Sequence, residues 1–214
     1  MTRRTVPVAV VIAAASALAL TACGGNDDAK ANDKIAGADV AETSAAPSDE
    51  TSTTERPQIT LPGDLTDTFE SWKTGDSAKD AVLQDVARRI DATNYAITQG
   101  DAEHSALDFY YDDAALAEAK DWVQSVVKAG YSITGANRYY NAKIDVFDSK
   151  SAGVVYCEDQ GKAYAKDRKS GKIHRTAVTA KSYVLYSSRV EKSAQGIWKT
   201  TKLTSQRGNK SCTP

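Results

Sequence analysis

The feature that most constrains the fold is a change of hydrophobic period at Gly130. Before it, apolar residues recur at helical spacing, as Val82, Val86 and Ile90 do, which indicates helices with one buried face. After it, the chain is rich in Thr, Tyr, Val and Ile and is divided by turn sequences such as "DRKSGK" and "SAQG". Helices followed by a run of antiparallel strands predict an α+β fold, with the helices packed on one face of a sheet.

The helical half contains its own start and stop signals. Ser77 and Asp80 are expected to form a capping pair at the start of the first helix, and Gly100 is expected to end it. The roughly 150 residues from Asp64 onward suit one domain with one core. The predicted helices cover residues 76–100, 102–111 and 114–129. The predicted strands are the segments "YSITGANRYYNAKIDVF", "AGVVYCED", "KAYAKD", "GKIHR", "KSYVLYSSRVEK" and "GIWKTTKLTSQR".

The N-terminus reads as an export signal. Arg3 and Arg4 supply a positive start, and the apolar stretch 6–20 is shorter than the about 20 residues that a membrane-spanning helix needs. The paired arginines also fit a twin-arginine signal, so the general and twin-arginine export routes both stay open.

The export signal ends in Leu20-Thr21-Ala22-Cys23, which resembles the lipobox of bacterial lipoproteins. The resemblance implies cleavage before Cys23 and attachment of acyl chains, such as palmitate, to that residue. Two or more acyl chains anchor a protein to a membrane far better than one. An ordinary signal peptide with a chance cysteine is the alternative. The expected segments are therefore a signal peptide over residues 1–22 and a lipidated N-terminus at the outer surface of the cell membrane.

The segment 23–63 is expected to be a disordered tether. From Gly24 to Gly63 it holds eight acidic and three basic residues and almost no bulky apolar side chain between Ile35 and Ile59. Low hydrophobicity with an excess of one charge favours disorder. The folded domain is accordingly expected over residues 64–214.

The cysteine count agrees with export. If Cys23 is lipidated, Cys157 and Cys212 remain, and an even number of cysteines in an oxidising compartment favours a disulfide between them. Two free thiols are the alternative. Two cysteines and two scattered histidines make no tetrahedral ligand set, so we expect neither a metal nor a cofactor.

The order of elements resembles the NTF2-like superfamily, in which a curved antiparallel sheet forms a cone around helices. The segments "GYSITGANRYYNAKI", "VVYCEDQGKAYAKDRKSGKIHRT" and "GIWKTTKL" followed by "SC" are also similar to uncharacterised secreted lipoproteins of actinomycete, Streptomyces-like bacteria. The resemblance implies an NTF2-like cone and a place on the cell surface. It carries no activity over to residues of this chain.

No catalytic motif is found in the sequence. His104 and His174 have no nucleophile at motif spacing, and no Gly-x-Ser-x-Gly, phosphate-binding loop or metal-binding pair occurs. We therefore expect a domain that is not an enzyme.

NTF2-like cones often hold a pocket, and the resemblance implies one here. Tyrosine combines apolar area with a polar hydroxyl, which suits a small amphipathic ligand. The alternative is that these aromatics only fill the space between sheet and helices, since tyrosine is favoured in strands. The candidate lining residues are Tyr95, Asp108, Tyr110, Trp122, Tyr139, Tyr140 and Tyr156.

Charge divides the domain into two halves. Residues 64–130 hold fourteen acidic and six basic residues, whereas residues 131–214 hold six acidic and sixteen basic ones. A basic cluster on the predicted hairpin fits anionic lipid headgroups or phosphate-bearing wall polymers. It equally fits a solvated tip that protects the sheet from edge pairing. The cluster consists of Lys162, Lys166, Arg168, Lys169, Lys172 and Arg175.

Together these features predict a cell-surface lipoprotein that binds a small amphipathic ligand or an envelope component without catalysis. One alternative is an exported isomerase or dehydratase that uses the cone pocket. Another is a structural or interaction accessory of an envelope complex. Nucleic acid is not expected as a partner of an exported protein with a pI near 6.1.

Overall fold

The computed structural model describes residues 55–214. The predicted signal peptide, the lipidation site Cys23 and most of the predicted tether lie outside the described residues. None of the helices between residues 55 and 214 combines the length and the apolar character that crossing a membrane requires.

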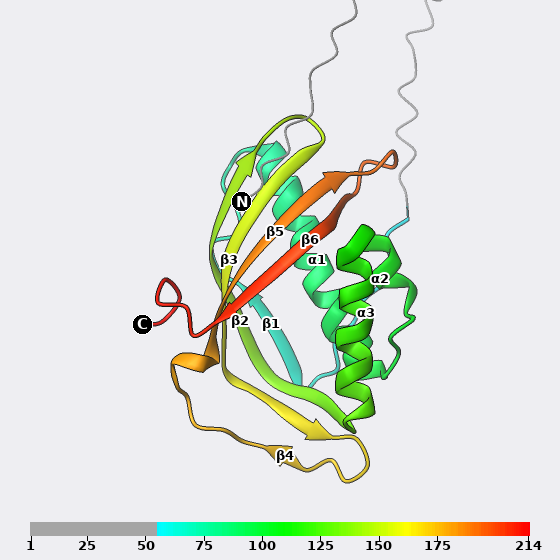
Figure 1. Ribbon diagram of the computed structural model, residues 1–214, viewed down its shortest axis with the longest axis vertical. Coiled ribbons are helices and arrows are strands. Elements are labelled where there is room, and N and C mark those ends of the chain that lie inside the picture. The colour runs from blue at the N-terminus through cyan, green and yellow to red at the C-terminus, as the bar shows by residue number, and fades with distance from the viewer. Residues whose placement is uncertain (1–54) are drawn as a thin grey trace, which may run out of the picture. The chain divides into compact units, whose positions relative to one another are not determined.

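Three helices form one layer of the domain (Figure 1). They are α1 (Ser77–Gln99), α2 (Ser105–Tyr110) and α3 (Asp113–Lys128). The three predicted helices are confirmed within a few residues at their ends. The expected capping pair is wrong, because Asp76 caps α1 by accepting hydrogen bonds from the backbone N–H groups of Ala78 and Lys79. Asp80 instead accepts from the backbone and hydroxyl of Thr74.

The sheet forms the second layer and curves around the helices (Figure 1). Its strand order is β1-β2-β3-β5-β6, with the short β4 paired to β3, and every pairing is antiparallel except that of β1 with β2. The bounds are β1 (Leu65–Phe69), β2 (Tyr131–Val146), β3 (Ser151–Asp167), β4 (Ile173–His174), β5 (Tyr183–Lys192) and β6 (Trp198–Arg207). The α+β class is confirmed, and the bent sheet wraps around the helices as the sequence predicted (Figure 1). The parallel strand β1 is an element that the hydrophobic pattern did not reveal.

Two register shifts bend the long strands. They lie between Ala136 and Arg138 and between Tyr140 and Lys143 of β2. A bulge bends its strand and re-aims the side chains that follow it. Gly135 stands beside the first shift with φ +102°, and a Cβ there would lie 2.1 Å from the carbonyl oxygen of Lys162. We infer that only glycine allows β2 and β3 to approach so closely at this bend.

The core lies between the helices and the concave face of the sheet. One cluster joins the first half of α1 to β2, β3 and β5, with Val82, Val86 and Val154 almost fully buried. A second cluster joins the end of α1 to α3 through Ile97 and Val123. The two clusters hold the helices against the sheet.

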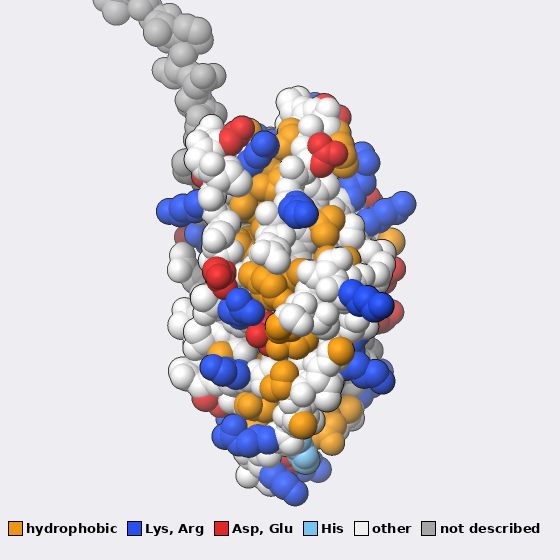
Figure 2. Space-filling view, turned by 90° about the vertical axis from the view of Figure 1, so that its left-hand side faces the viewer, with side chains coloured by type: hydrophobic (Ala, Val, Ile, Leu, Met, Phe, Trp, Pro, Cys, Tyr) orange, Lys and Arg blue, Asp and Glu red, His pale blue; other side chains and the backbone are white. Residues whose placement is uncertain are grey.

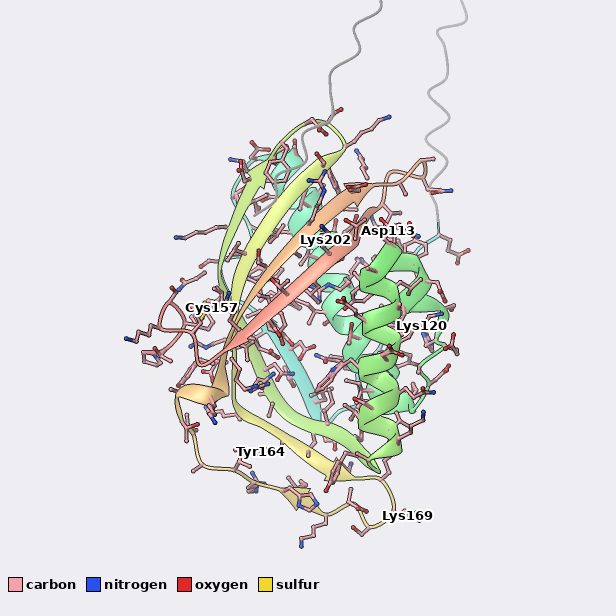
Figure 3. The ribbon with its side chains drawn as sticks, in the orientation of Figure 1. Asp113, Lys120, Cys157, Tyr164, Lys169 and Lys202 are labelled. Carbon is pink, nitrogen blue, oxygen red and sulfur yellow. A yellow bond between two sulfur atoms is a disulfide. The ribbon has the colours of Figure 1, made fainter. Side chains whose placement is uncertain are left out.

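Cys157 and Cys212 form a disulfide, with their Cα atoms 5.5 Å apart and a sequence separation of 55. It ties the C-terminal tail to the side of β3 that faces away from the helices (Figure 3). Tyr140 adds a second tie, because its hydroxyl donates a hydrogen bond to the backbone carbonyl of Cys212.

Residues just before Asp64, which the sequence assigned to the tether, contact the domain. Arg56 forms an ion pair with the buried Asp85 of α1, and Asp85 also accepts a 2.9 Å hydrogen bond from the backbone of Trp198. Ile59 packs against the cluster that contains Tyr110. The folded unit therefore begins several residues before position 64.

Candidate functional site: the cone cavity

A cavity of about 710 Å³ opens between α1, α3 and the concave face of the sheet, and we call it the cone cavity. Its volume lies in the range of pockets that bind small molecules. Most of its wall is apolar. The apolar lining residues are Ile90, Ile97, Ala115, Ala119, Trp122, Val126, Ala129, Ile133, Ala163, Ala165 and Leu203.

Glu158 of β3 is a carboxylate in this cavity wall, and only 5% of it is exposed to solvent. It accepts three hydrogen bonds, at 3.0 Å from Tyr139 Oη, 2.9 Å from Tyr186 Oη and 2.8 Å from Gln160 Nε2. Burial raises the pKa of Glu158, and the three donors oppose that rise. We call these four residues the Glu158 cluster.

The tyrosines of the cluster are held in place by other aromatic rings. Tyr186 stacks on Tyr156 with ring centroids 5.1 Å apart, and Tyr139 stacks on Phe69 at 5.1 Å. Burial also raises the pKa values of Tyr139 and Tyr186, so both hydroxyls remain protonated donors at neutral pH. The cluster is therefore a pre-formed arrangement of donors around one carboxyl group.

Arg89 of α1 brings a positive charge to the same cavity, with 3% of the residue exposed. Its Nη2 donates a 2.8 Å hydrogen bond to Tyr156 Oη and its Nη1 a 3.3 Å hydrogen bond to Tyr111 Oη. Tyr111 is linked in turn to the hydroxyl of Thr93 at 2.8 Å. Within the described residues, Arg89 takes part in no ion pair with a carboxylate, and its Nε has no hydrogen-bond partner.

A pair of acidic residues, Asp67 of β1 and Asp91 of α1, lies beside the Glu158 cluster. Asp67 accepts hydrogen bonds from Asn137 Nδ2 at 2.8 Å and from Asn94 Nδ2 at 2.6 Å, and Asn94 also donates to Tyr139 Oη. Burial raises the pKa of Asp67. Burial, and then the charge of Asp67, raise the pKa of Asp91 to about 7. The two carboxyl groups thus influence each other's titration just behind the cavity wall, since Asn94 and Asn137, which line the cavity, both donate to Asp67.

Three of the seven residues proposed for the pocket line the cavity. Tyr139 and Tyr156 stand at its polar end, and Trp122 stands at its mouth with 57% of its surface exposed.

The other four lie elsewhere. Tyr95 packs edge-on against His104, and Tyr110 is fully buried in a separate cluster. Tyr140 points away from the cavity toward the disulfide, under the guanidinium of Arg138. Asp108 forms a 3.0 Å ion pair with Lys120 on the outside of the helices.

Sequence reasoning missed the charged residues of the site, although a signal for each was present. Arg89 falls seven positions after Val82, so it lies on the buried face of α1. Glu158 continues the inward alternation of Val154 and Tyr156 on β3. In both cases the hydrophobic periodicity placed a charged residue on the buried face of its helix or strand, and that pattern indicates a functional residue.

The basic cluster does not form one free surface. Lys166 pairs with Asp64 at 2.8 Å, and Arg168 donates to the carbonyl groups of Tyr131, Thr98 and Ile97, two of which end α1. The exposed members are Lys162, Lys169, Lys172 and Arg175, and Lys169 stands at the tip of the β3–β4 turn (Figure 3).

The two histidines have structural contacts. His104 Nδ1 caps α2 by accepting a 3.2 Å hydrogen bond from the backbone of Ala106, and His174 lies edge-on to Tyr131. Among residues 55–214, no group of three or more His, Cys, Asp or Glu side chains is placed to hold a metal ion.

No family model matches the chain, and no curated protein matches it in sequence. Solved structures do match its fold at low identity. The intermembrane space region of the chloroplast protein ARC6 is 16% identical, covering 58% of this chain and 92% of its own, with a TM-score of 0.42. A ketosteroid isomerase-like protein from Erwinia carotovora atroseptica is 14% identical, covering 59% and 93%, with a TM-score of 0.41. A hexachlorocyclohexane dehydrochlorinase, LinA-type3 from Novosphingobium barchaimii, is 13% identical, covering 61% and 88%, with a TM-score of 0.42.

These likenesses concern the fold alone and transfer no activity to this chain. The expectation that the domain is not an enzyme is nevertheless corrected, because the cavity of this chain brings a buried carboxyl group and two tyrosine hydroxyls together. The expectation rested on the lack of a sequence motif. It is wrong as an exclusion, since Tyr139, Glu158 and Tyr186 come from three separate strands and leave no contiguous motif.

Proposed function

We propose that the domain takes up a small amphipathic molecule in the cone cavity. One observation carries the proposal: a mostly apolar cavity of about 710 Å³ ends in a buried, pre-formed set of polar groups, among them Glu158 and Arg89. The apolar wall would gain about 25 cal/mol for each Å² of ligand surface removed from water. The polar end would orient the ligand, since a group that fails to reach it leaves hydrogen bonds unmade.

Proton transfer to the bound molecule is a second candidate function, favoured by the Glu158 cluster. A carboxyl group whose pKa is raised by burial can exchange a proton closer to neutral pH than an exposed glutamate can. Tyr139 and Tyr186 would stabilise the carboxylate after it has given up its proton. Such a site suits an isomerisation or an elimination on the ligand.

We further propose that the protein acts at the outer surface of the cell membrane. The lipobox-like sequence ending in Cys23 supports this location, and the disulfide between Cys157 and Cys212 fits an oxidising compartment. Cys23→Ser should release the protein from the membrane fraction into the medium. Retention in the membrane fraction after that change would contradict the anchor.

Ligand uptake can be tested by native mass spectrometry of the exported chain carrying Cys23→Ser, which keeps every residue of the described domain. An added mass that is present under native conditions and leaves on denaturation is the expected result. Glu158→Gln should then retain that mass if Glu158 serves proton transfer, because the amide has the same shape. A bare protein from every host and extract tried would contradict uptake.

A further inference from the structure

We propose that Arg89 receives the anionic group of the ligand, which makes the ligand of the cone cavity a singly charged amphipathic anion such as a carboxylate. The inference rests on the proposed function, because it names the chemistry of the molecule that the cavity takes up. It starts from the surroundings of Arg89, which lack an acidic partner among the described residues.

The two buried charges of α1 have unlike surroundings. Asp85 pairs with Arg56 and also accepts a backbone hydrogen bond from Trp198. Arg89, one turn further on, donates to the hydroxyls of Tyr156 and Tyr111 and lies 5.5 and 5.9 Å from the ring centres of Tyr111 and Tyr156, with no carboxylate paired to it among the described residues. A buried charge without an opposite charge beside it is costly, and an ionic partner removes much of that cost.

The buried acidic group in the cavity wall is already engaged. Glu158 accepts from Tyr139, Tyr186 and Gln160, and it forms no ion pair with Arg89. The other acidic lining residue, Glu118, is exposed on α3 at the mouth. A ligand can therefore supply the counter-charge that the described residues do not.

Donors remain free for such a group. A guanidinium carries five N–H groups, and two of those on Arg89 are used, by Tyr156 and Tyr111. The planar fork of arginine is suited to a carboxylate. Burial raises the pKa of Tyr156 to about 12, although Arg89 lowers it, so this hydroxyl keeps its proton and can donate to the same anion.

The remaining wall limits the rest of the ligand. On the helix side Ile90 and Ile97 of α1 and Ala115 and Ala119 of α3 are apolar, and Thr93 and Asn94 are neutral polar residues. A second negative charge on the ligand would meet Glu158, which also lines the cavity. One anionic group on an apolar body is the class of molecule that satisfies both ends.

Two fluorescent dyes with the same ring system provide the test. 8-Anilinonaphthalene-1-sulfonate carries a sulfonate, and N-phenyl-1-naphthylamine is the uncharged counterpart. The exported Cys23→Ser chain should bind the sulfonate at least about 10-fold more tightly than the neutral dye. Arg89→Met should lower the affinity for the sulfonate dye roughly 10- to 100-fold and change the affinity for the neutral dye by less than about 3-fold.

Arg88→Met is the matched control, because it removes the same charge one position away on α1 and lies outside the cavity lining. It should leave both dyes unaffected. If Arg88→Met and Arg89→Met lower the affinity for the sulfonate dye equally, the dye responds to the overall charge of the protein and the inference is wrong. If Arg89→Met does not fold, as judged by circular dichroism, Arg89→Gln replaces it.

The dyes also separate this inference from the proposed function. Binding of both dyes to the unmutated chain with equal affinity would overturn the anion site and leave ligand uptake standing. Binding of neither dye would overturn both. Preference for the sulfonate that Arg89→Met abolishes, with the neutral dye still bound, is the result that supports the assignment.

Discussion

The concave and convex faces of the sheet carry neighbouring residues of the same types but use them differently. Tyr139 faces the cavity and donates to Glu158, whereas the adjacent Tyr140 faces outward and donates to the backbone of Cys212. On β3, Tyr156 and Glu158 line the cavity, whereas Cys157 between them bonds to the C-terminal tail. The concave face holds polar groups that a ligand can reach, and the convex face uses the same strands to fasten the chain.

The outer surface shows a second aspect of this difference. Figure 2 shows a band of apolar side chains running down the outer face of the sheet, with Lys and Arg side chains on both sides of it. The inner face instead encloses its apolar surface and buries a single positive charge, Arg89, in the cavity wall. Several basic residues therefore flank the outer face of the sheet, where solvent screens their charges (Figure 2). Arg89 is the one basic residue among the described residues that line the cavity.

The largest expected effect is loss of the disulfide on the convex face. Replacing Cys157 and Cys212 together by Ala should lower the free energy of unfolding by about 2–5 kcal/mol, because the bridge closes a long loop. Urea unfolding with and without a reductant measures it. Equal stability of the oxidised and reduced protein would show that the tail contributes nothing, and dye binding in the double variant should persist.

The next effect belongs to the acidic pair beside the cavity. The folded pKa of Asp91, about 7, stands above its ordinary value of 3.8. Its contribution to stability is therefore complete below about pH 4 and is lost as the pH rises through 7. Asp91→Asn should stabilise the protein by roughly 1–3 kcal/mol at pH 8 and by almost nothing at pH 4.

The control for that prediction is Asp80→Asn on the same helix. The pKa of Asp80 is lowered, chiefly by hydrogen bonds from Thr74, so this substitution should have the opposite pH dependence. Thermal unfolding of both variants across pH 4–8 compares them. If the stability of the Asp91 variant changed in parallel with that of wild type at every pH, the raised pKa of Asp91 would be refuted.

A smaller effect separates the adjacent tyrosines. Tyr139→Phe should weaken ligand or dye binding and raise the pKa of Glu158 further, because a donor to its carboxylate is lost. Tyr140→Phe should cost about 1 kcal/mol of stability and leave binding unchanged. Urea unfolding measures the stability of both variants, and dye titration measures their binding. Equal losses of binding would mean that the concave and convex faces of the sheet are coupled.

The smallest effect tests the basic residues of the β3–β4 hairpin. Arg168→Ser should cost about 1 kcal/mol, because its side chain satisfies carbonyl groups at the end of α1. Lys162→Ser, on the exposed surface, should change stability by less than about 0.5 kcal/mol. Similar losses for both would show that Arg168 is only a surface charge.

Much of the fold was predictable because its signals are local. The stripe of Val82, Val86 and Ile90 determines α1, and Gly100 ends it in a left-handed conformation with φ 75°. The turns at 167–172 and 193–196 lie where the sequence placed them. Cys157 and Cys212 were the two remaining cysteines, so their pairing followed from counting once export was assumed.

The site was predictable only in part because the strands change face. Up to Tyr139 the odd positions of β2 point inward, and beyond the register shift Ala142 and Ile144 pack inward instead. On β3, Glu158 and Gln160 face the cavity, and beyond the other shift Ala163 and Ala165 do. A period of two read along either strand assigns the wrong face after the shift.

By itself the sequence determined the α+β class, the three helices, the strand-rich half and the pair of cysteines, since each depends on neighbours along the chain. Only the tertiary structure decided which tyrosines line the cavity, that β1 joins the sheet in parallel, and that Arg89 of α1 and Glu158 of β3 line the same cavity. Those outcomes depend on bulges and on contacts between distant elements, and they decide which charges are buried without a partner.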